Sequence, residues 1–273
     1  MVDEKNKFSL TSDVLRLEAR RISWDSELLG YPVGEIISLD LEGRADSQCE
    51  FARFKSWVRE GDYGMISCRL PHQKLYESEL LERNDFRFIE MVLHPTIMNL
   101  QGIHIENQGL VVSTIDAVDI PLIGEIAAKA FSYERFHVDP YLNSDFGNSR
   151  YKRWVENSQS GDTQQLLKAT LNGKIIGFFL VEYRKDLVYW HLTAMSPEYQ
   201  GRGLGVRVWA AMMVRHQGDG FNQILTTISA RNVPVLNLYS KLNFRFMPPE
   251  MTFHWIKQEE SSHARPSSGQ CGK

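Results

Sequence analysis

The chain has 273 residues, a formal net charge of −3 at pH 7 and 24% charged residues. This balance shows no basic excess, so neither nucleic acid nor an anionic membrane surface is expected as a partner. No apolar run approaches the length of about 18 residues that a membrane-spanning helix needs, and the first residues lack the apolar core of a signal peptide. We therefore expect a cytoplasmic protein.

The cysteines and histidines give no sign of a metal site. Cys49, Cys68 and Cys271 are not spaced as metal ligands, and no H-x-x-x-H pair occurs among the eight histidines. We expect reduced thiols, with Cys49 and Cys68 buried or half-buried as small apolar fillers.

The N-terminal part of the chain predicts an alternation of strands and helices. Residues 1–17 are polar and are expected to be loosely ordered. A helix over 47–61 places Phe51, Phe54 and Trp57 on one side. The other predicted elements are strands at 36–39, 63–70 and 86–94 and a helix at 75–83. Residues 99–109 are polar and glycine-containing, which is typical of a linker.

The C-terminal part predicts a second set of strands and helices. A helix over 115–130 begins at Asp116 or Asp119, and Asn172-Gly173 predicts a tight hairpin between two strands. The remaining elements are strands at 166–171, 175–183, 187–195, 222–229 and 244–256 and helices at 204–217 and 233–242. From residue 259 the composition is typical of a disordered tail.

Six residues at one strand-to-helix junction carry most of the information about function. The segment Gln200-Gly201-Arg202-Gly203-Leu204-Gly205 follows a strand that ends near Pro197 and precedes a helix. Its glycines allow a tight turn that exposes backbone N–H groups at a helix N-terminus, where the helix dipole favours an anion. We expect it to hold a phosphate or pyrophosphate. Val208 stands where a dinucleotide-binding loop needs its third glycine, and no Gly-Lys-Ser/Thr occurs, so both of those phosphate loops are excluded.

A second motif follows at a suitable distance. Residues 232–244 read N-V-P-V-L-N-L-Y-S-K-L-N-F, with Val235, Leu236 and Tyr239 on one helical face. Pro234 fits the first turn of that helix. Asn243 stands at the helix end and is expected in the left-handed conformation.

Together the two motifs resemble those of the GNAT superfamily of acyl-CoA N-acyltransferases. The resemblance implies an α/β fold with a mixed α+β sheet, and acyl-CoA, acetyl-CoA or another short acyl form, as co-substrate without a metal. It also implies direct attack of an amine on the thioester in a ternary complex. The residues that would bind acyl-CoA are Thr193, Ala194, Met195, Gln200, Gly201, Arg202, Gly203, Leu204, Gly205, Val206 and Asn232.

The same resemblance assigns catalytic roles. The backbone at Met195 would polarise the thioester carbonyl. Tyr239 would protonate the leaving thiolate, because a phenol with a pKa of about 10 suits a thiol of about 8.5. The general base is open between His137, which we choose, a water chain, and four further side chains: Glu134, Asp139, Glu182 and His191.

A narrower resemblance concerns the acceptor. Residues 21–30, 130–140 and 154–157 resemble segments of sugar-nucleotide N-acetyltransferases of the dTDP-fucosamine acetyltransferase type. It implies a degenerate GNAT-like domain at 1–105, a catalytic domain at 106–258, a tail at 259–273, a homodimer and a role in polysaccharide biosynthesis. A faint repeat between 63–91 and 222–246 agrees with a duplicated half.

The substrate-binding residues expected from this comparison are Arg135, Phe136 and Trp154. Arg135 can donate two hydrogen bonds to a phosphate, and the aromatic rings can stack on a base or line the sugar. The expected acceptor is a nucleotide-linked amino-deoxy sugar. Two alternatives stay open: a GNAT enzyme for another small amine, and a CoA-binding sensor without turnover.

Overall fold

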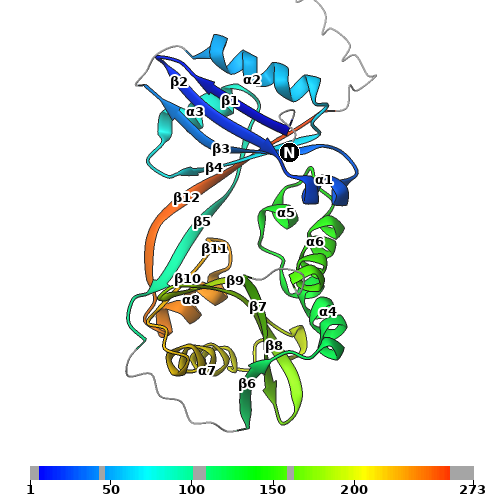
Figure 1. Cartoon of the computed structure of the whole chain (residues 1–273), viewed down its shortest axis with the longest axis vertical. Helices are drawn as coiled ribbons and strands as arrows, with labels where there is room; N and C mark the ends of the chain where they lie inside the picture. Colours follow the sequence, from blue (N-terminus) through cyan, green and yellow to red (C-terminus); the bar gives the residue numbers. More distant parts are fainter. Residues whose placement is uncertain (1–5, 43–46, 101–108, 159–162, 259–273) are drawn as a thin grey trace, which may run out of the picture.

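The computed structural model describes residues 6–42, 47–100, 109–158 and 163–258. Its strands form one twelve-stranded sheet in the order β1-β2-β3-β4-β12-β5-β10-β9-β8-β7-β6, with β11 beside β5 (Figure 1). The pairs β3–β4 and β9–β10 are parallel and the other pairs are antiparallel. The predicted mixed α/β fold is confirmed.

The elements divide by chain order into two groups. The first group contains β1 (Lys7–Thr11), β2 (Leu15–Arg21), α1 (Ser23–Leu29), β3 (Val33–Leu41), α2 (Gln48–Glu60), β4 (Met65–Pro71), α3 (Leu75–Arg83) and β5 (Arg87–Ile97). The second group contains β6 (Leu110–Thr114), η2 (Ala117–Asp119), α4 (Ile120–Ala130), α5 (Arg135–Val138), α6 (Ser144–Asn157), β7 (Gln164–Leu171), β8 (Lys174–Arg184), β9 (Leu187–Met195), η4 (Pro197–Tyr199), α7 (Gly205–Gly218), β10 (Gln223–Thr226), β11 (Ile228–Ser229), α8 (Val233–Lys241) and β12 (Arg245–Ile256).

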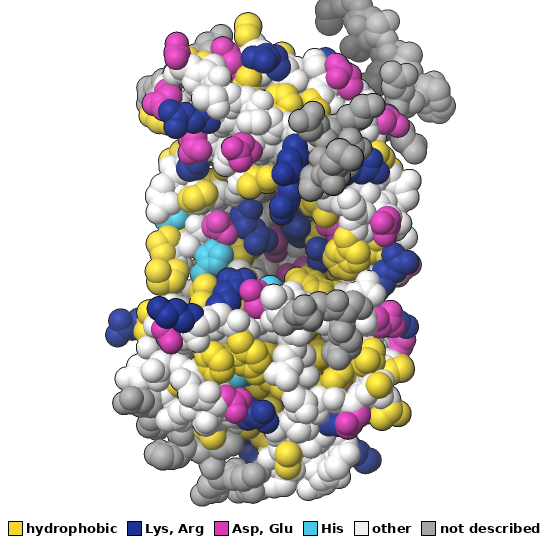
Figure 2. Space-filling model, viewed as in Figure 1, with side chains coloured by type: hydrophobic (Ala, Val, Ile, Leu, Met, Phe, Trp, Pro, Cys, Tyr) yellow, Lys and Arg dark blue, Asp and Glu magenta, His cyan; other side chains and the backbone are white. Residues whose placement is uncertain are grey.

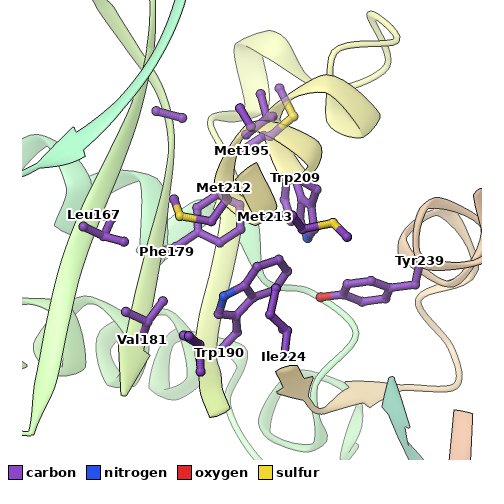
Figure 3. Packing of buried hydrophobic residues seen from close by; sticks show 14 of the residues in the cluster. Leu167, Phe179, Val181, Trp190, Met195, Trp209, Met212, Met213, Ile224 and Tyr239 are labelled. Carbon is purple, nitrogen blue, oxygen red and sulfur yellow. The ribbon is translucent and has the colours of Figure 1, made fainter. Parts of the chain in front are cut away.

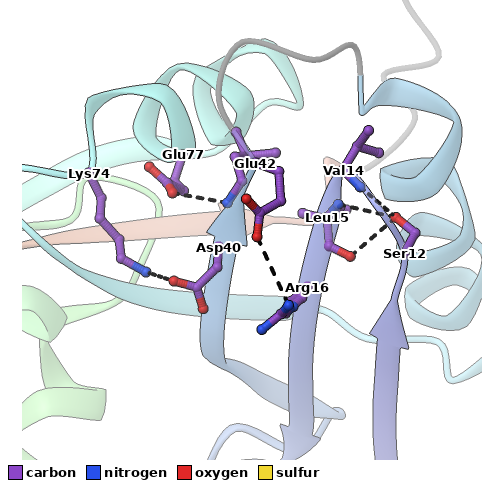
Figure 4. Close-up of polar contacts among 9 residues, drawn as sticks. Ser12, Val14, Leu15, Arg16, Asp40, Glu42, Lys74 and Glu77 are labelled. Atoms are coloured by element: carbon purple, nitrogen blue, oxygen red, sulfur yellow. Dashed lines mark hydrogen bonds and ion pairs between the residues drawn. The ribbon is translucent and has the colours of Figure 1, made fainter.

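The expectation of loose order over residues 1–17 is wrong for residues 7–17, which form β1, a turn and the start of β2. Leu10, Leu15 and Leu17 are buried, whereas Thr11 and Arg16 beside them are exposed. This period of two buries one face of the hairpin although its overall composition is polar. The Ser12 hydroxyl closes the turn by accepting hydrogen bonds from the backbone N–H groups of Val14 at 3.3 Å and Leu15 at 3.1 Å (Figure 4).

Polar contacts join the end of β3 to α3. The Glu77 carboxylate accepts a hydrogen bond from the Leu41 N–H at 3.0 Å, and the Lys74 ammonium pairs with Asp40 (Figure 4). These contacts hold α3 against β3.

Most of the other predicted elements are confirmed. Phe51 and Phe54 of α2 are buried, and Asn172 and Gly173 have φ angles of 50° and 78°, as the predicted tight hairpin requires. Helix α4 begins after Asp119, with Asp116 forming a capping box around η2. The short elements α1, α5, β6 and the helix α6 were not predicted, and the strand expected at 222–229 is divided into β10 and β11.

The two groups exchange their closing strands. In the first group α3 connects β4 to β5, and in the second group α8 leads from β11 to β12. Yet β12 lies between β4 and β5, and β5 lies between β12 and β10, so each group completes the sheet of the other (Figure 1). Met251 of β12 pairs with Leu70 on one side and with Met91 on the other.

The turns that precede these two strands are alike. Asp85 has a φ of 67° and is followed by Phe86, whose N–H donates to the Leu81 carbonyl at 3.1 Å. Asn243 has a φ of 60° and is followed by Phe244, whose N–H donates to the Tyr239 carbonyl at 3.0 Å. The left-handed helix end predicted at Asn243 is confirmed, and its counterpart in the first group carries Leu81 where the second carries Tyr239.

The cysteines agree only in part with expectation. Cys68 on β4 is buried, and burial raises the pKa of its thiol. Cys49 is exposed, which corrects the expectation of burial, because it lies on the opposite face of α2 from Phe51. Cys271 and the predicted tail at 259–273 lie outside the described residues.

Candidate functional site

A cavity of about 590 Å³ lies where the two groups meet. Figure 2 shows a hollow between the upper and lower parts of the molecule, with Lys and Arg side chains gathered around it. Its wall comes from β4 and β5 of the first group, and from the α4–α6 segment, β9, the 200–205 loop and α8 of the second group. The site is therefore built by residues that are far apart in the sequence.

The strands β9 and β10 separate at one end of the cavity. Their parallel pairing ends at Trp190 and Thr226, whereas β9 continues to Met195 paired with β8 alone. A register shift places His191 as an extra residue between Trp190 and Leu192, which bends β9 at this point. Residues 192–195 thus present an unpaired strand edge, to which an extended ligand with amide groups can bind as a further strand.

The glycine-rich loop lies at the end of this open edge. Gly201 and Gly203 have φ angles of 72° and 74°, which L side chains rarely adopt. The side-chain amide of Gln200 donates to the Met195 carbonyl at 3.0 Å and fixes the loop to β9. No side chain caps α7 at Leu204, so its first N–H groups lack an intrahelical partner and can receive an anion.

Tyr239 reaches the cavity from α8. Only 1% of its surface is exposed, and its hydroxyl points toward Trp190 and Trp209 (Figure 3). Burial raises the pKa of the phenol, and the polar groups of Trp209, Thr193 and Thr226 around it oppose part of that rise. The phenol is therefore protonated at neutral pH, as a proton donor must be.

The other residues expected to bind acyl-CoA are placed as follows. Asn232 lines the cavity and also caps α8, with its Oδ1 accepting from the Val235 N–H at 3.4 Å. Thr193, Ala194, Met195 and the loop residues Gln200, Gly201, Gly203, Leu204 and Gly205 line the cavity. Arg202 and Val206 do not line it, and the Arg202 guanidinium lies over the Tyr199 ring at 5.4 Å.

The opposite end of the cavity carries three arginines. Arg135 comes from α5, Arg150 from α6 and Arg69 from β4. Arg150 pairs with Asp25 at 2.8 Å, but within the described ranges no carboxylate lies within 4.0 Å of the guanidinium groups of Arg69 or Arg135. Burial, together with repulsion from Arg69 and Arg150, lowers the pKa of Arg135 to about 10, so it stays charged at neutral pH. This end is suited to an anion.

The two aromatic residues expected at the substrate differ in their surroundings. Phe136 is 2% exposed and packs with Val33, Met65 and Phe146, so most of its ring belongs to the core. Its face lies 4.6 Å from each of the guanidinium groups of Arg135 and Arg150, which it helps to position. Trp154 lines the cavity, and its indole N–H donates to Gln164 at 3.3 Å.

Three of the residues considered as general base do not line the cavity. His137 stacks on Tyr151 and contacts Asn148 at 3.1 Å, so the geometry gives no support to the catalytic role expected for it. Asp139 is buried between Arg87 at 3.2 Å and His254 at 2.8 Å. Glu182 pairs with Arg184 and His191, and these contacts lower its pKa to about 2.

Four residues of the site were missed from the sequence: Arg69, Glu90, Arg150 and Tyr151. Glu90 is 2% exposed and stands between Ile89 and Met91 of β5. A carboxylate between large apolar residues of a strand is unusual and is the signal that could have pointed to it. Arg69 gives no such signal, because it occupies an exposed position of β4.

Among the described residues, no three His, Cys, Asp or Glu side chains are grouped closely enough to hold a metal ion. Within the same ranges no helix has the length and apolar character needed to cross a membrane.

Comparisons with known proteins agree with the motifs. Residues 125–244 match the model of the acetyltransferase (GNAT) family. The spore coat polysaccharide biosynthesis protein SpsD of Bacillus subtilis (strain 168) is 25% identical over 126 residues. That match covers 46% of this chain and 44% of SpsD, so the chain spans less than half the length of this relative.

Solved structures show the same fold. A GCN5-related N-acetyltransferase from Sphaerobacter thermophilus superimposes with a TM-score of 0.60 at 11% identity, covering 88% of this chain and 76% of that one. A tandem GNAT protein from the clavulanic acid biosynthesis pathway gives a TM-score of 0.59 at 13% identity, covering 92% of this chain and 82% of that one. At these identities the likeness extends to the fold alone.

Proposed function

We propose that this chain, which carries an acetyltransferase domain of the GNAT family and is therefore an acyl-CoA-dependent N-acyltransferase, acylates the amine of a nucleotide-linked amino sugar. The acyl group is acetyl or another short chain. The observation that carries the proposal is one cavity that has an open strand edge and a glycine-rich loop in one part of its wall and, in another part, two arginines, Arg69 and Arg135, that have no ion-pair partner among the described residues.

The first end of the cavity fits acyl-CoA. Pantetheine amides would pair with the β9 edge at Thr193 and Met195, and the pyrophosphate would lie on the loop before α7. The thioester carbonyl would then accept a hydrogen bond from the backbone at Met195. The Tyr239 hydroxyl would be near the leaving sulfur and would protonate it.

The second end fits an anionic acceptor. Arg135 and Arg69 supply two guanidinium groups without a carboxylate partner within 4.0 Å, as counted over the described residues. Guanidinium groups bind phosphate through paired, charge-assisted hydrogen bonds. A diphosphate-linked sugar would satisfy them, and the sugar would lie toward the thioester. SpsD, which is named for spore coat polysaccharide biosynthesis, supports an acceptor of this kind.

The test compares acceptors with acetyl-CoA as donor. Release of CoA thiol and the product mass are measured with a dTDP-linked amino sugar, the free amino sugar and a polyamine. We expect turnover with the nucleotide-linked sugar and little with the other two. If the free sugar or the polyamine reacts as well, the acceptor is another small amine; if CoA binds and no amine reacts, the chain is a CoA sensor.

A matched pair of variants tests the arginine. Arg135→Ala should raise the Michaelis constant for the nucleotide sugar roughly ten- to a hundredfold and leave that for acetyl-CoA unchanged, because a charge-assisted contact is lost. Arg153→Ala, an exposed arginine on α6 that does not line the cavity, serves as the control. If the two variants have the same Michaelis constant for the nucleotide sugar, Arg135 does not bind the acceptor.

A further inference from the structure

Two carboxylates of the cavity wall have no role in the function proposed above. Glu134 precedes α5 and Glu90 lies on β5, and both line the cavity beside Arg135. Glu90 belongs to the first group of elements and Glu134 to the second, and we call the two together the carboxyl pair. An acceptor that brings a positively charged amine into this cavity meets the pair.

Glu90 is a buried group with unused hydrogen-bonding capacity. It is 2% exposed, and its Oε2 has no hydrogen-bond partner. Burial raises the pKa of this carboxyl, which Arg135 and the Ser229 hydroxyl partly oppose. A buried carboxylate oxygen without a partner is costly unless a ligand satisfies it, and an ammonium group or a sugar hydroxyl is such a ligand.

Glu134 has the surroundings of a proton acceptor. Burial and the nearby Glu90 raise the pKa of its carboxyl to about 7, against the opposing effect of Arg69, Arg135 and Arg150. Within the described part of the chain, the Glu134 carboxylate has no hydrogen-bond partner, and the charged groups around it act on it through space. Tyr151 of α6 is the other titratable group nearby, and its pKa is raised well above 10, so it stays neutral.

His191 is the other candidate for the general base that lines the cavity. Its Nε2 lies 2.8 Å from the Glu182 carboxylate, and burial lowers its pKa more than Glu182 raises it. Its ring is held between Trp154 and Tyr189. Glu182 orients the ring and leaves Nδ1 of His191 as the rival proton acceptor, but the lowered pKa makes His191 a weaker base than Glu134, whose pKa is raised.

We infer that Glu134 is the general base of the acyl transfer and that Glu90 positions the acceptor amine beside it. The ammonium of the acceptor gives one proton to the Glu134 carboxylate, and the resulting neutral amine forms a C–N bond with the thioester carbon. The C–S bond breaks as the tetrahedral intermediate collapses, and the thiolate takes the Tyr239 proton. The second proton of the attacking nitrogen leaves to solvent, which also reprotonates Tyr239 and deprotonates Glu134. The inference rests on the proposed acyl transfer to an amine.

The test uses Glu134→Gln in the full chain, with Glu156→Gln on the exposed face of α6 as control. We expect Glu134→Gln to lower kcat about 10²–10⁴-fold with unchanged acetyl-CoA affinity by calorimetry. The wild type and Glu156→Gln should lose kcat/KM as the pH falls below about 7, and this acidic limb should be absent from the residual activity of Glu134→Gln. In Glu90→Gln the limb should move to lower pH, because the charge that raises the pKa of Glu134 is gone.

An infrared titration makes the test independent of the acceptor. A carboxyl band that changes near pH 7 in the wild type and is missing in Glu134→Gln would identify the group even without turnover. If nucleotide sugars do not react but another amine does, the proposed acceptor is wrong and the kinetic test proceeds with that amine. A folded Glu134→Gln that keeps the acidic limb and more than about a third of the wild-type kcat would overturn the inference, as would loss of the limb in His191→Gln alone.

Discussion

A Cβ atom on Gly205 at the start of α7 would stand 2.8 Å from Cδ1 of Leu238 on α8, so any larger residue there would force the Leu238 side chain to move. Both residues line the cavity. This contact therefore forms part of the cavity wall between the glycine-rich loop and α8.

Replacing that glycine should displace the Leu238 side chain into the cavity wall. We expect Gly205→Ala to destabilise the protein by about 1 kcal/mol through overpacking and to weaken acetyl-CoA binding. Gly218→Ala is the matched control at the other end of α7, where no atom lies within 4 Å of an added Cβ; it should stabilise by about 0.5–1 kcal/mol. Thermal unfolding measures the stability of both variants, and calorimetry measures their affinity for CoA. An unchanged CoA affinity in Gly205→Ala would mean that the contact between Gly205 and Leu238 does not affect CoA binding.

The proposed pyrophosphate role of the glycine-rich loop can be tested against an equally strained position elsewhere. Gly203 and Gly173 have φ angles of 74° and 78°, and neither would meet an atom within 4 Å if it gained a Cβ. Gly203→Val and Gly173→Val should therefore cost similar stability, about 1–2 kcal/mol each. CoA binding should be abolished by the first alone, because its side chain would block the N–H groups. A folded Gly203→Val with normal CoA affinity would remove the loop from the ligand site.

The acid role of Tyr239 predicts a kinetic loss without a binding loss. Tyr239→Phe should lower kcat by about 10²–10⁴-fold while both Michaelis constants stay close to those of the wild type. The ring remains packed against Phe244, so unfolding should change little. If the loss is less than about threefold with chemistry rate-limiting, Tyr239 is a core residue of α8 and not the acid.

Stability should fall in mild acid because of a buried histidine. His216 is fully buried, its Nε2 accepts the Trp190 indole N–H at 3.0 Å, and burial lowers its pKa to about 4. The unfolded chain, with an ordinary histidine pKa of about 6.5, binds the proton first, so the stabilising effect is present above that pH and is lost between about 6.5 and 4. From pH 7 to 5.5 we expect a loss of about 1 kcal/mol from this residue.

The matched variant for this effect is His216→Gln, which keeps an acceptor for Trp190 and does not titrate. Its free energy of unfolding should vary less with pH than that of the wild type over the same interval. Denaturant unfolding at pH 7 and 5.5 gives both slopes, and parallel curves would show that His216 is not the cause. His254, whose pKa is also lowered to about 4 by burial, contributes the same trend in both proteins.

The sequence predicted the parts of the site that depend on local geometry. The loop at 200–205 follows from glycines between a strand and a helix, and the helix end at Asn243 follows from the residue itself. Arg69 and Glu90 could not be assigned to the cavity from the sequence, because their place depends on β12 entering between β4 and β5. Pairing between strands that are distant in the sequence depends on how the apolar faces of the sheet pack, and a short sequence motif does not predict that packing.

The role expected for His137 stays a prediction to which the geometry gives no support. A histidine in a polar segment is a reasonable base by composition, yet the short helix α5 turns its ring onto Tyr151 and places Glu134 at the cavity instead. Only Arg135 and Phe136 lie between the two along the chain, and α5 as a four-residue helix was too short to predict from periodicity.

The exchange of β5 and β12 also determines how this protein can be divided. A fragment of residues 109–258 would carry the glycine loop and Tyr239, but it would leave the outer edge of β10 uncovered and would lack Arg69 and Glu90. A fragment ending at residue 100 would lack the strand that joins β4 to β5. The two halves are therefore interlocked subassemblies, and a substitution in the half without the glycine loop can change acceptor selection as directly as one in the other half.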